Sequence, residues 1–177
     1  MTSYVAFLRG INVGGNKKVP MADLKKLLES LGHKNVRTLL ASGNAIFDVS
    51  SGTAATLKKD IESAFTKKFG FSSHIILRTI DDIAALVHSN PFRGIPVTKD
   101  TRLYVTFFTD KPTSKLKTYT SPDGNFRILR VSEFELCSVL TVAPNSRSVD
   151  LMAIVEKEFG KNVTTRNWNT IEKILGK

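Results

Sequence analysis

The sequence predicts an α+β fold made of two similar halves, each with the element order βαββαβ of a ferredoxin-like plait. Short apolar runs of strand length alternate with segments whose apolar residues recur at helical spacing. The order found in residues 1–80 recurs in the second half, after a stretch at 90–100 that contains two prolines and one glycine. Few residues are identical between the halves, so the internal duplication that we predict is one of topology.

The first half begins with a strand and an amphipathic helix. Tyr4–Arg9 is an apolar run, and Ala22–Leu31 repeats leucine at helical spacing. Pro20 favours the start of that helix and Gly32 its end. The same reasoning gives the other elements of this half. They are strands Val36–Ala41 and Ala45–Val49 joined by a turn at Ser42-Gly43-Asn44, a helix from Thr53 to Phe69, a strand His74–Arg78 and a helix Asp81–His88.

The second half is predicted to repeat this order. Its elements are a strand Leu103–Phe108, a short helical turn Ser114–Thr118, strands Phe126–Val131 and Phe134–Val142, a helix Val149–Phe159 capped by Ser148, a strand Asn162–Arg166 and a helix from Trp168 to Leu175. The stretch between them divides the chain into two lobes, residues 1–90 and 91–177.

The net charge of +10 and the pI near 9.8 favour a polyanionic partner, such as a nucleotide or a nucleic acid. The charge is spread evenly, because residues 1–90 carry 12 basic against 7 acidic residues and residues 91–177 carry 14 against 9. A single cysteine, Cys137, excludes an internal disulfide and favours a reducing compartment. We see neither a signal peptide nor an apolar run of about 20 residues, so we expect a cytoplasmic protein of bacterial type without a membrane partner.

The stretch of residues 8–20 joins an apolar strand to a helix, and its composition predicts an anion site. Its glycines permit left-handed backbone and a close approach to a ligand; they are Gly10, Gly14 and Gly15. Its cations lie beside a helix N-terminus, which itself favours anions; they are Arg9, Lys17 and Lys18. A phosphate-bearing small molecule or a nucleic acid fits this pattern. The alternative is a structural loop whose asparagines bond its own backbone.

The plait order predicts that three loop segments meet at one edge of the first sheet. With strand order 4-1-3-2, these segments are 9–18, 42–44 and 71–74. The candidate ligand-binding residues gathered there are Arg9, Asn12, Gly14, Gly15, Lys17, Lys18, Ser42 and Asn44. The loop is no P-loop, because Asn16 stands where that motif requires lysine.

A second hypothesis is an enzyme acting on a small anionic metabolite, with Arg9, Asn12 and Asn44 polarising the substrate. The sequence offers no evident general base, since no acid is placed to orient a pair of Ser42 and His74. The catalytic residues are therefore unknown. The histidines lack metal-ligand spacing and Cys137 has no companion, so we expect neither a metal nor a cofactor.

A second motif, Arg166-Asn167-Trp168-Asn169-Thr170, gives a possible second site made of Arg166, Asn167 and Trp168. In the structural interpretation, Trp168 anchors the core and Asn169 caps a helix together with Glu172. In the functional one, Trp168 lies over a base or sugar and its neighbours donate hydrogen bonds. A further alternative is that both motifs fasten the two lobes together.

The motifs Leu8-Arg9-Gly10-Ile11-Asn12-Val13-Gly14-Gly15, Val19-Pro20-Met21, Ser42-Gly43-Asn44, Asn90-Pro91-Phe92 and 166–170 occur in this order along the chain. Together they resemble a mainly bacterial family, domain of unknown function 1697, over essentially the whole chain. The resemblance implies a two-part α/β plait fold. It implies no established activity, substrate or cofactor, and it supplies no catalytic residues.

Overall fold

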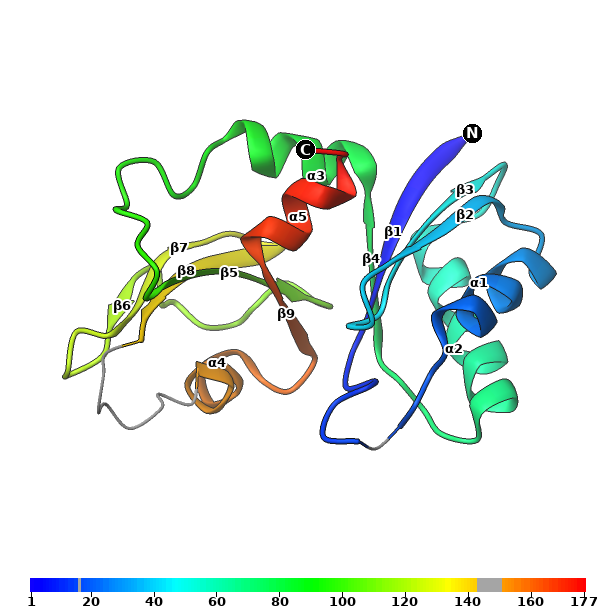
Figure 1. Ribbon diagram of the computed structural model, residues 1–177, viewed down its shortest axis with the longest axis horizontal. Helices are drawn as coiled ribbons and strands as arrows, with labels where there is room; N and C mark the ends of the chain where they lie inside the picture. The colour runs from blue at the N-terminus through cyan, green and yellow to red at the C-terminus, as the bar shows by residue number, and fades with distance from the viewer. Residues whose placement is uncertain (16, 143–150) are drawn as a thin grey trace. The chain divides into compact units, whose positions relative to one another are not determined.

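The computed structural model describes residues 1–15, 17–142 and 151–177, which form a mixed α+β fold with two antiparallel sheets and five helices (Figure 1). The chain divides into two compact units, Met1–Ala84 and Ala85–Lys177. The division falls within the helix α3 (Ile80–His88). Among the described helices, none combines the length and the hydropathy needed to cross a membrane.

The first unit contains four strands and two helices before α3. In chain order they are β1 (Thr2–Leu8), α1 (Met21–Ser30), β2 (Lys34–Leu39), β3 (Asn44–Val49), α2 (Ala54–Phe69) and β4 (Ile75–Thr79). The strands pair antiparallel in the order β2-β3-β1-β4, which is the order expected from the sequence. The central strand β1 pairs through Val5 with Ile46 of β3 and with Arg78 of β4.

Both helices of the first unit cover one face of its sheet (Figure 1). Leucines of α1 and the aromatic Phe65 of α2 pack with strand residues in one buried cluster. The Thr53 hydroxyl caps α2 by accepting a hydrogen bond from the Thr56 amide at 3.2 Å, and Gly70 ends it with φ +77°. Helix periodicity and these punctuation residues explain why the predicted bounds lie within two residues of the observed ones.

The second unit carries a five-stranded sheet in the order β6-β7-β8-β5-β9, with all neighbours antiparallel. Its elements are β5 (Thr101–Phe108), β6 (Tyr119–Thr120), β7 (Phe126–Val131), β8 (Glu135–Thr141), α4 (Leu151–Phe159), β9 (Val163–Asn167) and α5 (Trp168–Ile174). Helix α4 packs on one face through the buried Val155 and through Phe159, whose ring stacks on Phe108 at 5.2 Å.

Two predicted details of the second half were wrong. Residues 114–118 form no helix, because so short a segment cannot repay the cost of the first helical turn; the Leu116 amide bonds to the Ser114 hydroxyl instead. The second half therefore does not repeat the order βαββαβ. Helix α5 starts at Trp168 with Asn167 in the cap position, so Asn169 is no cap. The predicted cap Ser148 lies outside the described residues, together with Val149.

Candidate functional site

Three segments meet at one end of the first sheet, and we call their described residues the loop edge: 9–15 with 17–18, 40–43 and 71–74. The Leu8 amide donates to the Gly43 carbonyl at 2.9 Å, and the Arg9 amide donates to the His74 carbonyl at 2.9 Å. The Ser73 hydroxyl donates to the Arg9 carbonyl at 2.9 Å. The structure thus brings together the segments that the strand order predicted, and hydrogen bonds join all three.

Asn12 braces the loop after β1. Its side-chain amide donates to the carbonyls of Val19 at 3.0 Å and Ala41 at 2.8 Å, and its Oδ1 accepts from the Val19 amide at 2.8 Å. Its backbone amide also donates to the Lys17 carbonyl at 3.1 Å, which closes the loop. Because these bonds occupy the Asn12 side chain, it acts as a support for the loop.

The glycines of this loop are exposed and left-handed. Gly10, Gly14 and Gly15 have φ of +68°, +61° and +77°. A Cβ added at any of them would meet nothing within 4 Å. Glycine is therefore favoured there by the backbone conformation and not by crowding, and the glycines are exposed to solvent.

Gly43 of the same edge is glycine for a different reason. It is buried, with φ +83°, and a Cβ there would lie 2.7 Å from Cδ1 of the buried Ile11 and 3.1 Å from Cβ of Leu8. The connection between β2 and β3 consists of residues 40–43, because β2 ends at Leu39 and β3 begins at Asn44. This close contact seats the loop on the turn.

Two cations of the loop face solvent. Lys17 and Lys18 are exposed, and within the described residues neither forms an ion pair with a carboxylate. The Lys17 ammonium lies 5.8 Å from the centroid of the Phe71 ring, so the third segment of the loop edge also contacts the first. Arg9 is half-buried at the start of the loop.

The other polar residues of the edge bond to their neighbours. The buried Asn44 amide donates to the Leu39 carbonyl at 2.8 Å and to the Ser42 hydroxyl at 3.1 Å. His74 Nδ1 lies 3.5 Å from the Glu62 carboxylate, which also accepts from the Ile75 amide at 2.9 Å. The sequence did not indicate a role for Glu62, because nothing in the pattern of α2 shows that its carboxylate contacts His74 and Ile75.

The second motif lies in the second unit, where Arg166 and Thr170 are buried, Trp168 is half-buried, and Asn167 and Asn169 are exposed. The Arg166 side chain is 8% exposed and donates to the Thr164 hydroxyl at 2.8 Å and the Thr165 carbonyl at 2.9 Å. Burial lowers the pKa of Arg166 to about 10, which leaves it protonated at neutral pH. The Trp168 ring packs edge-on against the buried Phe92 at 5.0 Å. These contacts support the structural interpretation of the motif, in which Trp168 anchors the core.

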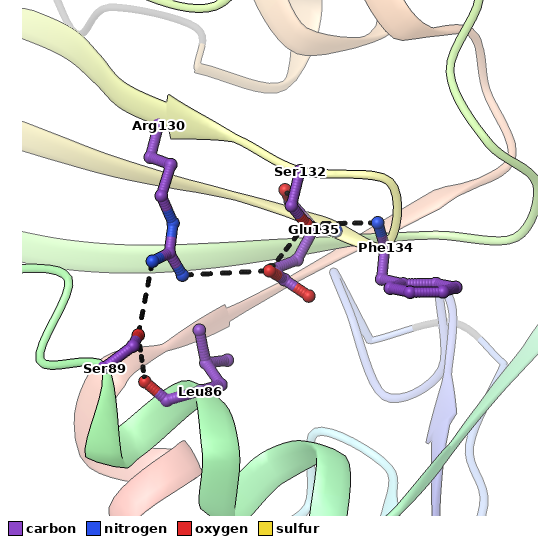
Figure 2. Close-up of polar contacts among 6 residues, drawn as sticks. All are labelled: Leu86, Ser89, Arg130, Ser132, Phe134 and Glu135. Carbon is purple, nitrogen blue, oxygen red and sulfur yellow. Dashed lines mark hydrogen bonds and ion pairs between the residues drawn. The ribbon is translucent and has the colours of Figure 1, made fainter.

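Figure 2 shows a polar cluster of the second unit that the sequence did not reveal. The Arg130 guanidinium donates to the Ser89 hydroxyl at 3.2 Å and lies 3.8 Å from the Glu135 carboxylate. Glu135 in turn accepts from the Ser132 hydroxyl at 2.6 Å. The cluster ties the segment after α3 to the β7–β8 hairpin, because Arg130 bridges the two.

Two further features limit the chemistry of the described residues. Burial raises the pKa of the Cys137 thiol to about 12, so this cysteine is a poor nucleophile. In the part of the chain that the structure describes, no group of three or more His, Cys, Asp or Glu side chains is placed to hold a metal ion.

The fold and the loop edge define a class: an α+β protein of two units whose first sheet carries a glycine-rich loop before its first helix. The chain belongs to the family described as Protein of unknown function (DUF1697), which matches residues 1–130. The family that the motifs resembled is thereby confirmed.

The fold is similar to that of a conserved bacterial protein, SP0830 from Streptococcus pneumoniae. The two are 23% identical with a TM-score of 0.67, over 98% of this chain and 96% of that chain. No curated protein sequence matches this chain.

Proposed function

We propose that the loop edge binds a phosphate-bearing ligand, either a nucleotide or a phosphate of a nucleic acid. One observation carries the proposal. An exposed, left-handed glycine backbone is braced by Asn12 and flanked by Lys17 and Lys18, which pair with no carboxylate of the described residues. Such a loop combines main-chain donors with positive charge that no carboxylate of the described residues neutralises.

The bracing matters because an anion site needs donors that are already in position. A loop that must be ordered by its ligand loses part of the binding free energy to that ordering. Here Asn12 links the loop to Val19 and to Ala41 of the neighbouring turn. Gly14 and Gly15 donate no backbone hydrogen bond to another described residue. As far as the described residues extend, their amides are therefore available to an oxyanion.

Titration with inorganic phosphate, a nucleotide panel and short oligonucleotides, at two salt concentrations, tests the proposal. We expect the double variant Lys17→Ala/Lys18→Ala to weaken phosphate binding by about tenfold or more, because each charged hydrogen bond contributes about 1.5–3 kcal/mol. The matched control is Lys115→Ala/Lys117→Ala, which removes the same charge from exposed positions of the second unit.

Each outcome has a definite meaning. Equal weakening by the two double variants would mean that only net charge attracts the anions. Absence of binding by the unchanged protein would refute the proposal directly. A steep salt dependence with oligonucleotides, combined with a weak response to nucleotides, would select the nucleic acid as the ligand.

We also propose that the first unit is a ferredoxin-like plait and that the second is a diverged copy of it. The strand orders β2-β3-β1-β4 and β7-β8-β5-β9 correspond, which supports a common origin. Solubility and cooperative unfolding of fragments 1–90 and 91–177, expressed separately, would test the two-lobe division. A cytoplasmic location is part of the same proposal, since the one cysteine is a buried free thiol.

A further inference from the structure

Exposed apolar side chains are few in the described residues, and two of them lie at the loop edge. Val13 is 68% exposed and Leu40 is 47% exposed. The other large apolar side chains with high exposure are Met1, Val97, Phe134 and Val142. An exposed aliphatic group beside a proposed ligand site is in a position to contact an apolar part of the ligand, whereas an isolated one is not.

The backbone brings these two residues to the same part of the edge. Val13 follows Asn12, and Leu40 precedes Ala41. The Asn12 side chain donates to the Ala41 carbonyl at 2.8 Å, so the residues next to Val13 and Leu40 are hydrogen-bonded to each other. The aliphatic pair thus flanks the brace that holds the glycine loop.

Leu40 adopts a conformation that leucine rarely takes. Its φ is +59°, in the left-handed region where the Cβ of an ordinary residue is strained. Burial does not offset this cost, because nearly half of the side chain is exposed. Asparagine or glycine would fit the backbone better, so the leucine is better explained by a contact with a ligand than by folding.

We infer that the ligand of the loop edge is a nucleoside phosphate whose base rests on Val13 and Leu40 while its phosphate lies on the glycine loop. The inference rests on the proposed function. It adds what the phosphate is attached to, which the phosphate site alone does not specify. Ligand sites combine apolar walls with a few placed polar groups, and a nucleobase presents a flat surface to aliphatic side chains. A sugar phosphate would leave this aliphatic pair without a contact.

Adenosine monophosphate and ribose 5-phosphate isolate the contribution of the base, since they share the phosphate and the sugar. We expect the unchanged protein to bind adenosine monophosphate more tightly. Leu40→Asn and Val13→Thr each remove aliphatic surface, and we expect each to weaken that binding by about fivefold, with no change for ribose 5-phosphate. Val97→Thr is the matched control, because Val97 is also 68% exposed but belongs to the second unit.

Folding is checked by thermal unfolding, where Leu40→Asn should match or exceed the unchanged protein because asparagine tolerates positive φ. If Leu40→Asn and Val13→Thr leave adenosine monophosphate binding unaltered while phosphate still binds, the base contact is refuted and the proposed function stands. Equal weakening of both probes also refutes it, because Leu40 would then act through the loop. If neither probe nor inorganic phosphate binds, the proposed function itself fails.

Discussion

The two sheets share a strand arrangement but differ in the segment that leaves their first strand. In the first unit, β1 leads through the glycine-rich loop into α1. In the second unit, β5 leads through residues 109–118, which contain no glycine and no helix, into the short β6. Corresponding strand orders therefore do not imply the same loops, and binding residues are found disproportionately on loops.

The first polar groups after β5 are also paired within the second unit. The Thr109 amide and hydroxyl both donate to the Asn162 carbonyl, at 3.1 and 3.0 Å. The Lys111 ammonium pairs with the Glu133 carboxylate. In the first unit, by contrast, Lys17 lies over an aromatic ring and pairs with no described carboxylate. This difference between Lys111 and Lys17 supports placing the proposed anion site in the first unit.

The largest expected difference between the two units comes from adding a side chain at Gly43. Gly43→Ala should destabilise the first unit by about 2–4 kcal/mol, since the new Cβ meets the buried Ile11 and the φ of +83° is unfavourable. Gly124→Ala is the control in the second unit, where φ is +72° but nothing lies within 4 Å. Hydrogen exchange of β1 and β8 peptides measures both. Equal losses in the two variants would show that backbone strain alone decides.

Trp168→Ala tests whether the second motif is structural. We expect it to destabilise the second unit by about 2–3 kcal/mol, because the ring packs on Phe92. Phosphate titration should not change. Hydrogen exchange of β5 and β9 peptides reports the stability, and a lost phosphate response in a folded variant would contradict the structural role.

Asn12→Ala should cost about 2 kcal/mol and weaken phosphate binding, although Asn12 is proposed to touch no ligand. The variant loses three side-chain hydrogen bonds and places alanine at φ +55°. Asn12→Asp separates donor from acceptor, because it retains the acceptor for the Val19 amide but turns a carboxylate toward two carbonyls. Chemical unfolding and phosphate titration should show both variants impaired. An intact phosphate response in either one would exclude the bracing role.

The smallest expected effect is a pH dependence confined to the first unit. His33 is buried against the Phe47 ring at 4.5 Å, and burial lowers its pKa below 6.5, with the Asp60 carboxylate opposing this. The unfolded chain therefore takes up the proton more readily. Stability should fall as the pH drops through about 6.5 toward the lower folded pKa. Unfolding at pH 7.5 and 5.5 should show less of this loss in His33→Phe, and an identical loss would assign it to another group.

The sequence predicted the first unit well because its signals are local. The leucine spacing of α1 and the glycine that follows α2 are each readable within a few residues. In the second half, the helical turn predicted at 114–118 does not form, because so few helix-compatible residues cannot hold a helix without tertiary contacts. For the candidate site, composition indicated the glycines and lysines. The different role of Asn12 depends on Ala41, which lies 29 residues away.

By itself the sequence determined the family, the strand order of the first sheet and the segments that meet at its loop edge. Periodicity and turn residues suffice for these, since they are encoded in neighbouring positions. Only the tertiary structure decided which loop residues hold the loop in place and which face solvent. It separated Gly14, open to solvent, from Gly43, pressed on Ile11, because that distinction depends on contacts between segments distant in the chain.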